Sequence, residues 1–363
     1  VAAAVRESGQ TTLELRQRLA AKVFALTAGY DHAIATWMAS ESNTTTGAEA
    51  LSLPERLLVS MPRSQVLRYG ENPHQPAALY GGFLDAFEKL HGKELSYNNI
   101  IDMDAAATLI EEFDEPAAAI IKHTNPCGCA VGQTVLAAYQ DALRTDPTSA
   151  FGGIIVFNRE VNIQLAETLN EMFSEVIIAP AFADDALDIL RRKRDRRLVR
   201  MRPADAASNT LQVKSVRNGY LCQMADTGRD DDASWRCVTR RTPTADEQAA
   251  LAFAWKVVKH VKSNAIVYTD AFRTLGVGAG QMSRVDSSAI AVSKAANARI
   301  SLDGAVVASD AFFPFADGLL EAVKAGATAV IQPGGSVRDD EVIAAADEHE
   351  IAMILTGRRH FRH

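Results

Sequence analysis

The sequence predicts an α/β fold built from two successive units of similar size. Short apolar segments alternate with segments of helical periodicity along most of the chain, which is typical of sheets covered by helices. The alternation runs twice, with a polar connection near residues 200–244 between the two runs. The 363 residues are 47% hydrophobic and 23% charged, as in globular proteins, and suffice for two or three domains. We therefore expect largely parallel sheets with helices on their faces.

Residues 1–60 are expected to stand apart from the two α/β units. Apolar residues recur at helical spacing over residues 11–40, and Thr11 with Glu14 fits a capping box. Residues 41–53 are small and polar, which indicates a linker. The chain has no initiator Met, and its start lacks the basic segment and long apolar core of a signal peptide. We expect it to begin inside a longer parent protein.

The two α/β units are expected to consist of short buried strands and amphipathic helices. In the first unit, the pattern predicts strands at 117–121, 153–157 and 176–179 and helices at 134–144 and 165–173. In the second unit, a capping box of Thr244 and Glu247 opens a helix. There the pattern predicts helices at 244–261, 284–298, 317–325 and 339–349 and strands at 265–268, 275–278, 305–308, 329–331 and 351–355.

Composition and charge argue against several classes of protein. The net charge of −7 is unlike that of a general nucleic-acid binder, which carries a basic excess. Four cysteines in so long a chain are no disulfide framework and favour a reducing, cytoplasmic setting. No apolar stretch approaches the roughly 18 residues of a membrane-spanning helix. The basic run at 191–200 and the acidic run at 226–234 are expected to be solvated surface segments.

Lys122 and His123 are a first pair of candidates for chemistry. They directly follow an apolar strand, and ligands of open α/β sheets bind at the carboxyl ends of the strands. An imidazole has a reference pKa of about 6.5, and a neighbouring ammonium favours its neutral, base-competent form. Lys122 would then bind an anion or stabilise developing negative charge. The same spacing is also that of an ordinary surface Lys-His pair.

Cys127 and Cys129 favour a structural role over a metal site. The segment NPCGC is similar to the P-C-x-x-C half of a zinc deaminase site, but its spacing is C-x-C and no H-x-E precedes it. Cys222 and Cys237 lie far along the chain and complete no tetrahedral set. We expect small packed cysteines in a tight turn, and no zinc.

Two further segments combine turns with groups that bind anions. LGVGAGQMSR lacks the third glycine and the later acidic residue of a dinucleotide motif, so its glycines indicate a tight turn, while Arg284 at a helix start could bind an anion. LRYGENPHQ places Arg68, Tyr69 and His74 around a Gly-Glu-Asn-Pro turn. Such a turn suits a phosphate or a sugar, and it is also an ordinary Asn-Pro turn.

An aromatic loop and the end of the chain complete the candidates. In SDAFFPFADG, three phenylalanines surround a proline between Asp310 and Asp317. They suit a flat heteroaromatic ligand, with faces for stacking and carboxylates for ring N–H groups, although core packing is the common use of phenylalanine. The terminal TGRRHFRH follows a buried strand and is rich in arginine and histidine. Docked at the strand edge, it would supply donors to a site.

Taken in order, these segments resemble one family, the bifunctional purine-biosynthesis proteins that combine aminoimidazole carboxamide ribonucleotide (AICAR) formyltransferase with inosine monophosphate (IMP) cyclohydrolase. The resemblance covers residue 61 to the end and rests on LRYGENPHQ, LSYNNIIDMDAA, KHTNPCGCAVG, DPTSAFGGIIVFNRE, KSNAIVY, GVGAGQMSR, SDAFFPF, IQPGGSVRDDEVIAAADEHEIAM and RHFRH. Residues 1–60 look like the last helices of the cyclohydrolase domain and a linker. Because most of that domain is absent from this sequence, we expect no cyclisation from this chain alone.

The resemblance implies a fold and a reaction. The fold would be a duplicated, zinc-free, cytidine-deaminase-like α/β fold, with subdomains at 61–208 and 209–363. The reaction would transfer the formyl group of 10-formyltetrahydrofolate to the 5-amino group of AICAR. His123 would be the base for that amine, and Lys122 would stabilise the oxyanion.

The resemblance also implies binding residues and partners. Arg68 would bind the ribotide phosphate, with Arg359 and Asn99 holding the nucleotide. The nucleotide and folate pockets would be lined by Tyr69, Phe151, Asn264, Arg284, Phe312, Phe315, Asp317, Phe361 and His363. The family implies a homodimer with sites at the interface, and a potassium ion near Ser263 and Asp310. A zinc-type nucleobase deaminase and a non-catalytic ligand-binding subunit remain the alternatives.

Overall fold

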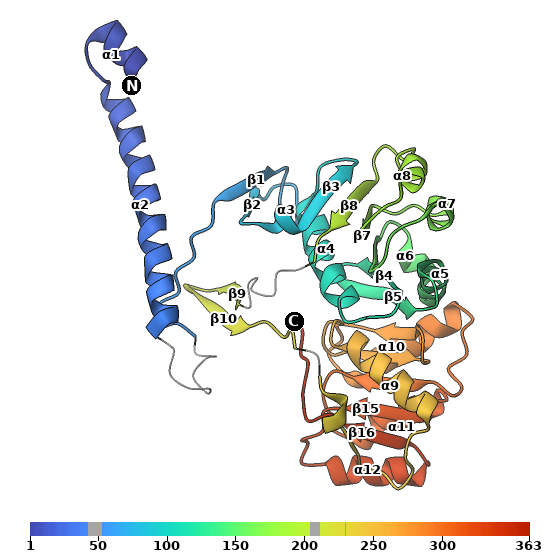
Figure 1. The fold of residues 1–363 in the computed structure, drawn as a ribbon. Coiled ribbons are helices and arrows are strands. Elements are labelled where there is room, and N and C mark those ends of the chain that lie inside the picture. Colours follow the sequence, from blue (N-terminus) through green and yellow to red (C-terminus); the bar gives the residue numbers. More distant parts are fainter. Residues whose placement is uncertain (43–52, 204–210, 229) are drawn as a thin grey trace. The chain divides into compact units, whose positions relative to one another are not determined.

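The computed structural model describes residues 1–42, 53–203, 211–228 and 230–363, without the side chains of 39–42 (Figure 1). The described chain divides into two compact units. The smaller unit comprises Val1–Arg63 and Ala207–Thr227, and the larger comprises Ser64–Ala206 and Gly228–His363. None of the helices in the described ranges combines the length and apolarity that a membrane span requires.

The smaller unit contains two helices and a hairpin. Helix α1 spans Ala2–Ser8, and helix α2 spans Leu13–Ser42, close to the predicted range. The predicted cap of α2 is off by one residue, because Oγ1 of Thr12 accepts the amide of Leu15 at 3.1 Å. The antiparallel hairpin consists of β9 (Leu211–Val216) and β10 (Gly219–Met224).

The first half of the larger unit holds a six-stranded sheet in the order β3-β8-β7-β6-β4-β5 (Figure 1). Ahead of it, β1 (Arg63–Leu67) and β2 (Ala77–Tyr80) form a two-stranded sheet. The strands of the large sheet are β3 (Phe87–His91), β4 (Ala117–Lys122), β5 (Asn125–Val131), β6 (Ile154–Phe157), β7 (Val176–Ala179) and β8 (Arg197–Met201). The helices are α3 (Phe83–Ala86), α4 (Tyr97–Ile110), α5 (Val135–Thr145), α6 (Pro147–Ala150), α7 (Ile163–Glu171) and α8 (Asp184–Leu190).

The second half holds another six-stranded sheet, in the order β11-β16-β15-β14-β12-β13. Its strands are β11 (Arg236–Cys237), β12 (Ile266–Thr269), β13 (Thr274–Gly278), β14 (Val306–Ser309), β15 (Ala329–Gln332) and β16 (Ala352–Leu355). Its helices are the 3₁₀ helix η1 (Asp232–Ser234), α9 (Ala245–Val258), α10 (Arg284–Asn297), α11 (Ala316–Lys324) and α12 (Asp339–Glu348). The predicted capping box of Thr244 and Glu247 opens α9.

The two sheets repeat one topology, which confirms the predicted duplication. In each, a hairpin (β4–β5 or β12–β13) is followed by a strand antiparallel to its first member and by two parallel neighbours. A short antiparallel strand closes the far edge of each sheet. The sheets are therefore mixed rather than largely parallel, because a two-residue or short turn can join only antiparallel strands.

The edge strands β5 and β13 lie beside each other and join the two sheets. The amide of Val131 donates to the carbonyl of Phe272 at 2.8 Å. The amide of Cys129 donates to Oγ1 of Thr274 at 3.0 Å, and Oγ1 of Thr145 donates to the carbonyl of Thr274 at 2.6 Å. These bonds leave neither edge open for pairing with another chain along this stretch.

Close packing of helix on strand recurs in both halves. A Cβ on Gly128 in β5 would lie 1.9 Å from the carbonyl oxygen of Ala142 in α5. A Cβ on Gly278 in β13 would lie 1.8 Å from the carbonyl oxygen of Ser287 in α10. Glycine is thus required where each hairpin's second strand meets the helix that follows it.

One hydrophobic core serves both halves of the larger unit. It draws buried side chains from α4 and α9 and from strands of both sheets. The rings of Phe113 and Phe253 meet at 5.5 Å between centroids. The two halves therefore share apolar burial as well as the β5–β13 junction.

Three local expectations are wrong. Cys127 and Cys129 are buried in the strand β5 rather than in a tight turn. Within the basic run, Arg196 is 2% exposed, because carbonyls at the end of α7 and the amide oxygen of Asn170 accept its donors. Within the acidic run, the carboxylate of Asp230 is buried among three donors, so that run is not uniformly solvated.

Candidate active site

The hairpin turn between β4 and β5 presents the Lys122-His123 pair. Lys122 pairs with Asn125 across the hairpin, so His123 and Thr124 alone make the turn. Both have left-handed backbones, with φ of 52° and 64°. Such turns suit the twist of a hairpin, but each non-glycine residue in this region costs about 1–2 kcal/mol. His123 is exposed, and contacts with neighbouring residues must stabilise its left-handed backbone conformation.

Asp102 on α4 stabilises this turn by a hydrogen bond to its backbone. Its Oδ1 accepts the amide of Thr124 at 2.6 Å. Burial raises the pKa of the Asp102 carboxyl, while the amide of Thr124 and the nearby His123 act in the opposite direction. The carbonyl of His123 is also bound, since it accepts Nδ2 of Asn125 at 3.1 Å and Oγ1 of Thr124 at 2.6 Å.

Lys122 reaches toward the loop that carries Phe151. Its Nζ donates to the carbonyl of Phe151 at 2.7 Å. The ring of Phe151 is 61% exposed and meets that of Phe173 at 5.4 Å. The ammonium is thus bonded to the backbone of the loop that carries this exposed ring, with donors left over for an anionic or carbonyl oxygen.

Asn125 links the hairpin turn to the second half of the larger unit. While its Nδ2 donates to His123, its Oδ1 accepts the amide of Lys262 at 2.9 Å. This contact brings the turn next to residues 262–264, which precede β12. Sequence reasoning missed Asn125, although it stands inside the quoted KHTNPCG segment; an asparagine just after a tight turn was the available signal.

Arg284 and Asn264 lie at the start of α10 and before β12. Arg284 donates to Oδ1 of Asn264 and, at 3.0 Å, to Oδ1 of the fully buried Asp310. Asn264 in turn donates from Nδ2 to the carbonyl of Gln281 at 2.9 Å. Burial lowers the pKa of the Arg284 guanidinium and Asp310 opposes this, so the pair is held as a desolvated ion pair.

The C-terminal segment brings Arg359 and Phe361 to Arg284. The guanidinium of Arg359 lies 4.3 Å from the centroid of the Phe361 ring, and that of Arg284 lies 6.0 Å from it. The ring of His363 meets Phe361 at 5.4 Å. Phe361 is 43% exposed. These terminal residues therefore join the Arg284 cluster, as expected for donors docked at a strand edge.

The aromatic loop before α11 contacts the Arg284 cluster at its start, where Nε of Arg284 donates to the carbonyl of Ala311 at 3.3 Å. Phe312 is half-buried, and the exposed Phe315 carries the guanidinium of Arg338 at 4.7 Å from its ring centroid. Asp317 is exposed in the first turn of α11 and binds the amide of Gly318. Phe313, in contrast, is buried in the core. Within the loop, Phe313 thus packs in the core, whereas Phe315 faces solvent.

The remaining predicted residues lie on the first half of the larger unit. Arg68 is exposed and its guanidinium lies 5.4 Å from the ring centroid of the half-buried Tyr69. Asn99 is 5% exposed and forms a capping box with Ser96 at the start of α4, while its Nδ2 donates to Glu175 at 3.0 Å. The side chain of Asn99 is thus committed to capping and to a carboxylate.

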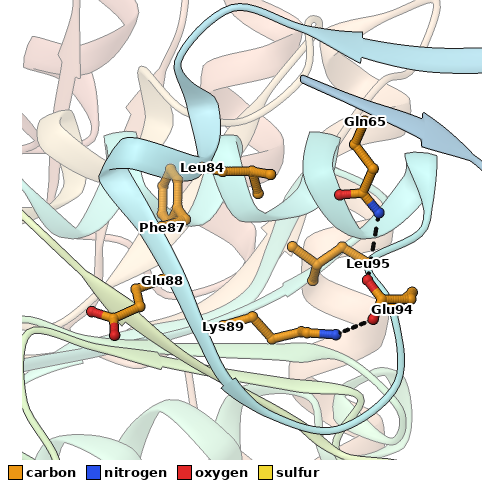
Figure 2. Close-up of a pocket in the computed structure, with 7 residues that line it drawn as sticks. All are labelled: Gln65, Leu84, Phe87, Glu88, Lys89, Glu94 and Leu95. Carbon is orange, nitrogen blue, oxygen red and sulfur yellow. Dashed lines mark hydrogen bonds and ion pairs between the residues drawn. The ribbon is translucent and has the colours of Figure 1, made fainter. Parts of the chain in front are cut away.

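A hollow lies elsewhere on this half, between the start of β1, α3 and β3 (Figure 2). Its lining pairs Lys89 with Glu94 at 2.6 Å, and Gln65 with the same carboxylate at 3.4 Å. Since these polar groups are already bonded to one another, the hollow has no convergent free groups of the kind that mark a reaction centre.

The described residues contain no group of three His, Cys, Asp or Glu side chains placed to bind a metal. Burial raises the pKa of Cys127 to about 12 and that of Cys129 further, so both thiols stay protonated. At the predicted cation position, Oδ2 of Asp310 accepts the Ser263 hydroxyl, and its Oδ1 accepts Arg284 and the amide of Ala265. Both carboxylate oxygens are thus occupied by donors, which fits a potassium ion poorly.

Comparison with known proteins identifies relatives over nearly the whole chain. Residues 1–294 match the family described as AICARFT/IMPCHase bienzyme. The chain is 58% identical over 360 residues to the "Bifunctional purine biosynthesis protein PurH" of Chloroflexus aurantiacus, covering 98% of this chain and 68% of that protein. It is 52% identical over 369 residues to the protein of the same name from Chlorobium phaeobacteroides (strain BS1), covering 98% and 69%. The chain thus spans about two thirds of the length of these relatives.

Proposed function

The chain belongs to the AICARFT/IMPCHase bienzyme family, and we propose that it transfers the formyl group of 10-formyltetrahydrofolate to the 5-amino group of AICAR, giving FAICAR in IMP biosynthesis. The observation that carries this proposal is the turn that presents Lys122 and His123 together and is bonded through Asn125 to the segment next to Arg284. Family membership favours this reaction over the deaminase and the non-catalytic alternatives.

The chemistry of the transfer explains the residue types. The amine of AICAR is weakly nucleophilic, because its lone pair is delocalised into the ring and the carboxamide. Its nitrogen attacks the formyl carbon while a base removes a proton, and the imidazole of His123 is assigned that task. The formyl oxygen becomes an oxyanion, which the Lys122 ammonium stabilises. The bond from carbon to N10 of the folate then breaks, and N10 takes a proton as tetrahydrofolate leaves.

Binding roles follow from the charges and rings around this pair. Arg68 binds the ribotide phosphate, and Arg359 with Asn99 holds the nucleotide. Asn99 Nδ2 donates one hydrogen to Glu175, and its second N–H is the donor proposed for the nucleotide. The remaining members of the pocket in this proposal are Tyr69, Phe151, Asn264, Arg284, Phe312, Phe315, Asp317, Phe361 and His363.

The organisation of the chain is part of the proposal. Residues 1–60 correspond to the end of a cyclohydrolase domain and a linker, and 61–208 and 209–363 to the two formyltransferase subdomains. The protein acts in the cytoplasm as a homodimer whose partner completes the site. Analytical ultracentrifugation that found only monomer during turnover would contradict the dimer.

The proposed formyl transfer requires no zinc, and potassium is considered at one position. We expect metal analysis of the active protein to find no stoichiometric zinc. Potassium near Ser263 and Asp310 is the weaker element, because donors already occupy the carboxylate. Replacing potassium by tetramethylammonium in the assay is expected to lower turnover, and unchanged turnover would refute this potassium site.

A direct assay tests the function. AICAR and 10-formyltetrahydrofolate are incubated with the chain, and FAICAR and tetrahydrofolate are measured by chromatography. We expect His123→Ala to lower turnover about 10²- to 10⁴-fold, as for loss of a general base, with AICAR binding retained. Lys122→Met is expected to cost about 10²- to 10³-fold.

Matched surface variants serve as controls. The exposed His349 and Lys193 lie on the α12 cap and in the basic run, so His349→Ala and Lys193→Met should leave turnover unchanged. Near-wild-type turnover in His123→Ala would refute the assignment of the base. No FAICAR from the wild-type chain as a folded dimer would refute the function itself.

A further inference from the structure

The C-terminal segment, residues 356–363, is held in place although it forms no regular structure. Its side chains alternate in burial: His360 is 1% exposed, whereas Arg359 and Phe361 on either side of it face outward. A terminal segment with so little structure of its own normally frays unless other groups fix it. The question is which groups do so.

Asp230 is the main side-chain anchor of this segment. Its Oδ2 accepts Nε2 of His360 at 2.7 Å and the indole Nε1 of Trp255 at 2.6 Å. Its Oδ1 accepts NH1 of Arg358 at 2.9 Å. The carboxylate is 9% exposed, and the ring of His360 packs edge-on against Trp255 at 5.2 Å. Charge-assisted bonds of this length in a buried setting are among the stronger ones in proteins.

Backbone bonds continue the attachment beyond His360. The amide of His360 donates to the carbonyl of Asp310 at 3.1 Å. The amide of Arg362 donates to Oγ of Ser263 at 3.0 Å, and the amide of Ser263 donates to the carbonyl of Arg362 at 2.9 Å. The anchored segment therefore lies against the residues that flank Asn264 and the ion pair of Arg284 with Asp310.

A second buried carboxylate supports the end of the segment. NH1 of Arg362 donates to Nδ1 of His260 at 3.3 Å, and Nε2 of His260 lies 3.0 Å from Oε1 of Glu112. The same oxygen accepts Nζ of Lys259 at 2.7 Å. Burial lowers the pKa of His260, which favours the neutral ring that can accept from Arg362. This chain of bonds fixes Arg362, while Asp230 binds the His360 ring.

We infer that Asp230 is a positioning residue that acts through His360 and Arg358 to present Arg359 and Phe361 to the substrate. The inference rests on the proposed formyl transfer and deepens it. It assigns a role to a residue 130 positions away from His360 in the sequence, in a segment expected to be a solvated acidic loop. Without the carboxylate, the donors of Arg358, Trp255 and His360 lose their common acceptor, and the outward residues lose their fixed place.

The kinetic test uses the full chain with Asp230→Asn, which keeps the shape of the side chain and removes its charge. We expect the KM for AICAR to rise about tenfold with kcat within about twofold, because the segment contributes binding groups rather than the base. The exposed Asp232 lies two residues on in η1, and Asp232→Asn is the matched control with unchanged constants. An unchanged KM in Asp230→Asn would overturn the inference.

Combining Asp230→Asn with variants of Arg359 and Phe361 tests whether Asp230 acts by positioning these two residues or has a general structural role. In a chain already carrying Arg359→Ala and Phe361→Ala, Asp230→Asn should raise KM less than threefold, since the groups that it positions are gone. A loss as large as in the wild-type background would overturn the inference. His360→Phe, which keeps the packing on Trp255 and removes the donor, should reproduce the Asp230→Asn effect.

Hydrogen exchange provides a readout independent of activity. We expect Asp230→Asn to speed exchange of the His360 and Arg362 amides at least tenfold while the amides of β12 keep their wild-type rates. Unchanged exchange at His360 would overturn the inference. If the wild-type chain forms no FAICAR, the proposed function fails, and this exchange measurement still decides whether Asp230 holds the segment.

Discussion

Replacing Asp102 by asparagine should slow formyl transfer by loosening the turn that carries His123. The carboxylate accepts the amide of Thr124 at 2.6 Å, and both turn residues have left-handed backbones. Asparagine keeps an oxygen in the same place but removes its charge. The turn remains possible in the variant, so the expected effect is graded rather than complete.

The size of the effect follows from the bond that is weakened. A hydrogen bond to a charged acceptor contributes about 1.5–3 kcal/mol, and one to a neutral acceptor about 0.5–1.5 kcal/mol. The difference of about 1–1.5 kcal/mol is comparable to the cost of one left-handed non-glycine residue, about 1–2 kcal/mol. Because about 1.4 kcal/mol corresponds to a factor of ten, turnover should fall about five- to tenfold.

Steady-state kinetics at saturating AICAR and folate measures the change. We expect kcat to fall in the order wild type, Asp102→Asn, Asp102→Ala, with the KM for AICAR nearly constant. The exposed Asp188 on α8 gives the matched control, Asp188→Asn, with no change. If Asp102→Asn and Asp102→Ala both keep kcat within twofold of wild type, the turn does not depend on this carboxylate and the reasoning fails.

Three further predictions concern stability. Gly128→Ala should lower the free energy of unfolding of the larger unit by about 2–4 kcal/mol, measured in urea. The added Cβ would lie 1.9 Å from the carbonyl oxygen of Ala142, so α5 must shift and strain the Thr145–Thr274 bond. The control Gly29→Ala, where a Cβ meets nothing nearer than 3.7 Å, should not lower it. Arg241 lowers the pKa of Glu247 to about 2. Wild type should therefore have a higher free energy of unfolding than Glu247→Gln above about pH 4.5, and this difference should vanish as pH falls toward 2. A difference that persists at about pH 2 would contradict the prediction. Thr274→Val removes the hydroxyl shared at the β5–β13 junction and should lower the free energy of unfolding by about 1–3 kcal/mol. Thr242→Val, on the surface, should leave it unchanged.

The parts of the fold that the sequence predicts are those fixed by local periodicity. The helices α9, α10 and α12 and the strands β4, β6 and β7 lie within a few residues of their predicted ranges, since their apolar residues recur at a clear period. The strand β5 was missed because its NPCGC start carries turn-forming residues. Its position is set by pairing with β4 and by contact with β13, which no local pattern records.

The proposed site residues come from sequence motifs, whereas the residues that support them do not. Lys122, His123 and Arg284 stand in segments that resemble the family. Asp102 and Asp230 act across 22 and 130 positions of sequence, so only the folded chain shows their partners. Asn99 illustrates the reverse case, because a residue expected at the nucleotide is bonded to the helix start and to Glu175.

The repeated hairpin has been put to two different uses. In the first copy, the β4–β5 turn is short, and its two left-handed residues expose a histidine. In the second copy, the corresponding β12–β13 connection is longer, and the carbonyl of Phe272 within it accepts Val131 at the end of β5. The first connection thus exposes the proposed base, and the second joins the two halves. Exchanging the two hairpin connections should remove the exposed histidine and the bond to Val131 at once, so the two copies of the hairpin are not interchangeable in this chain.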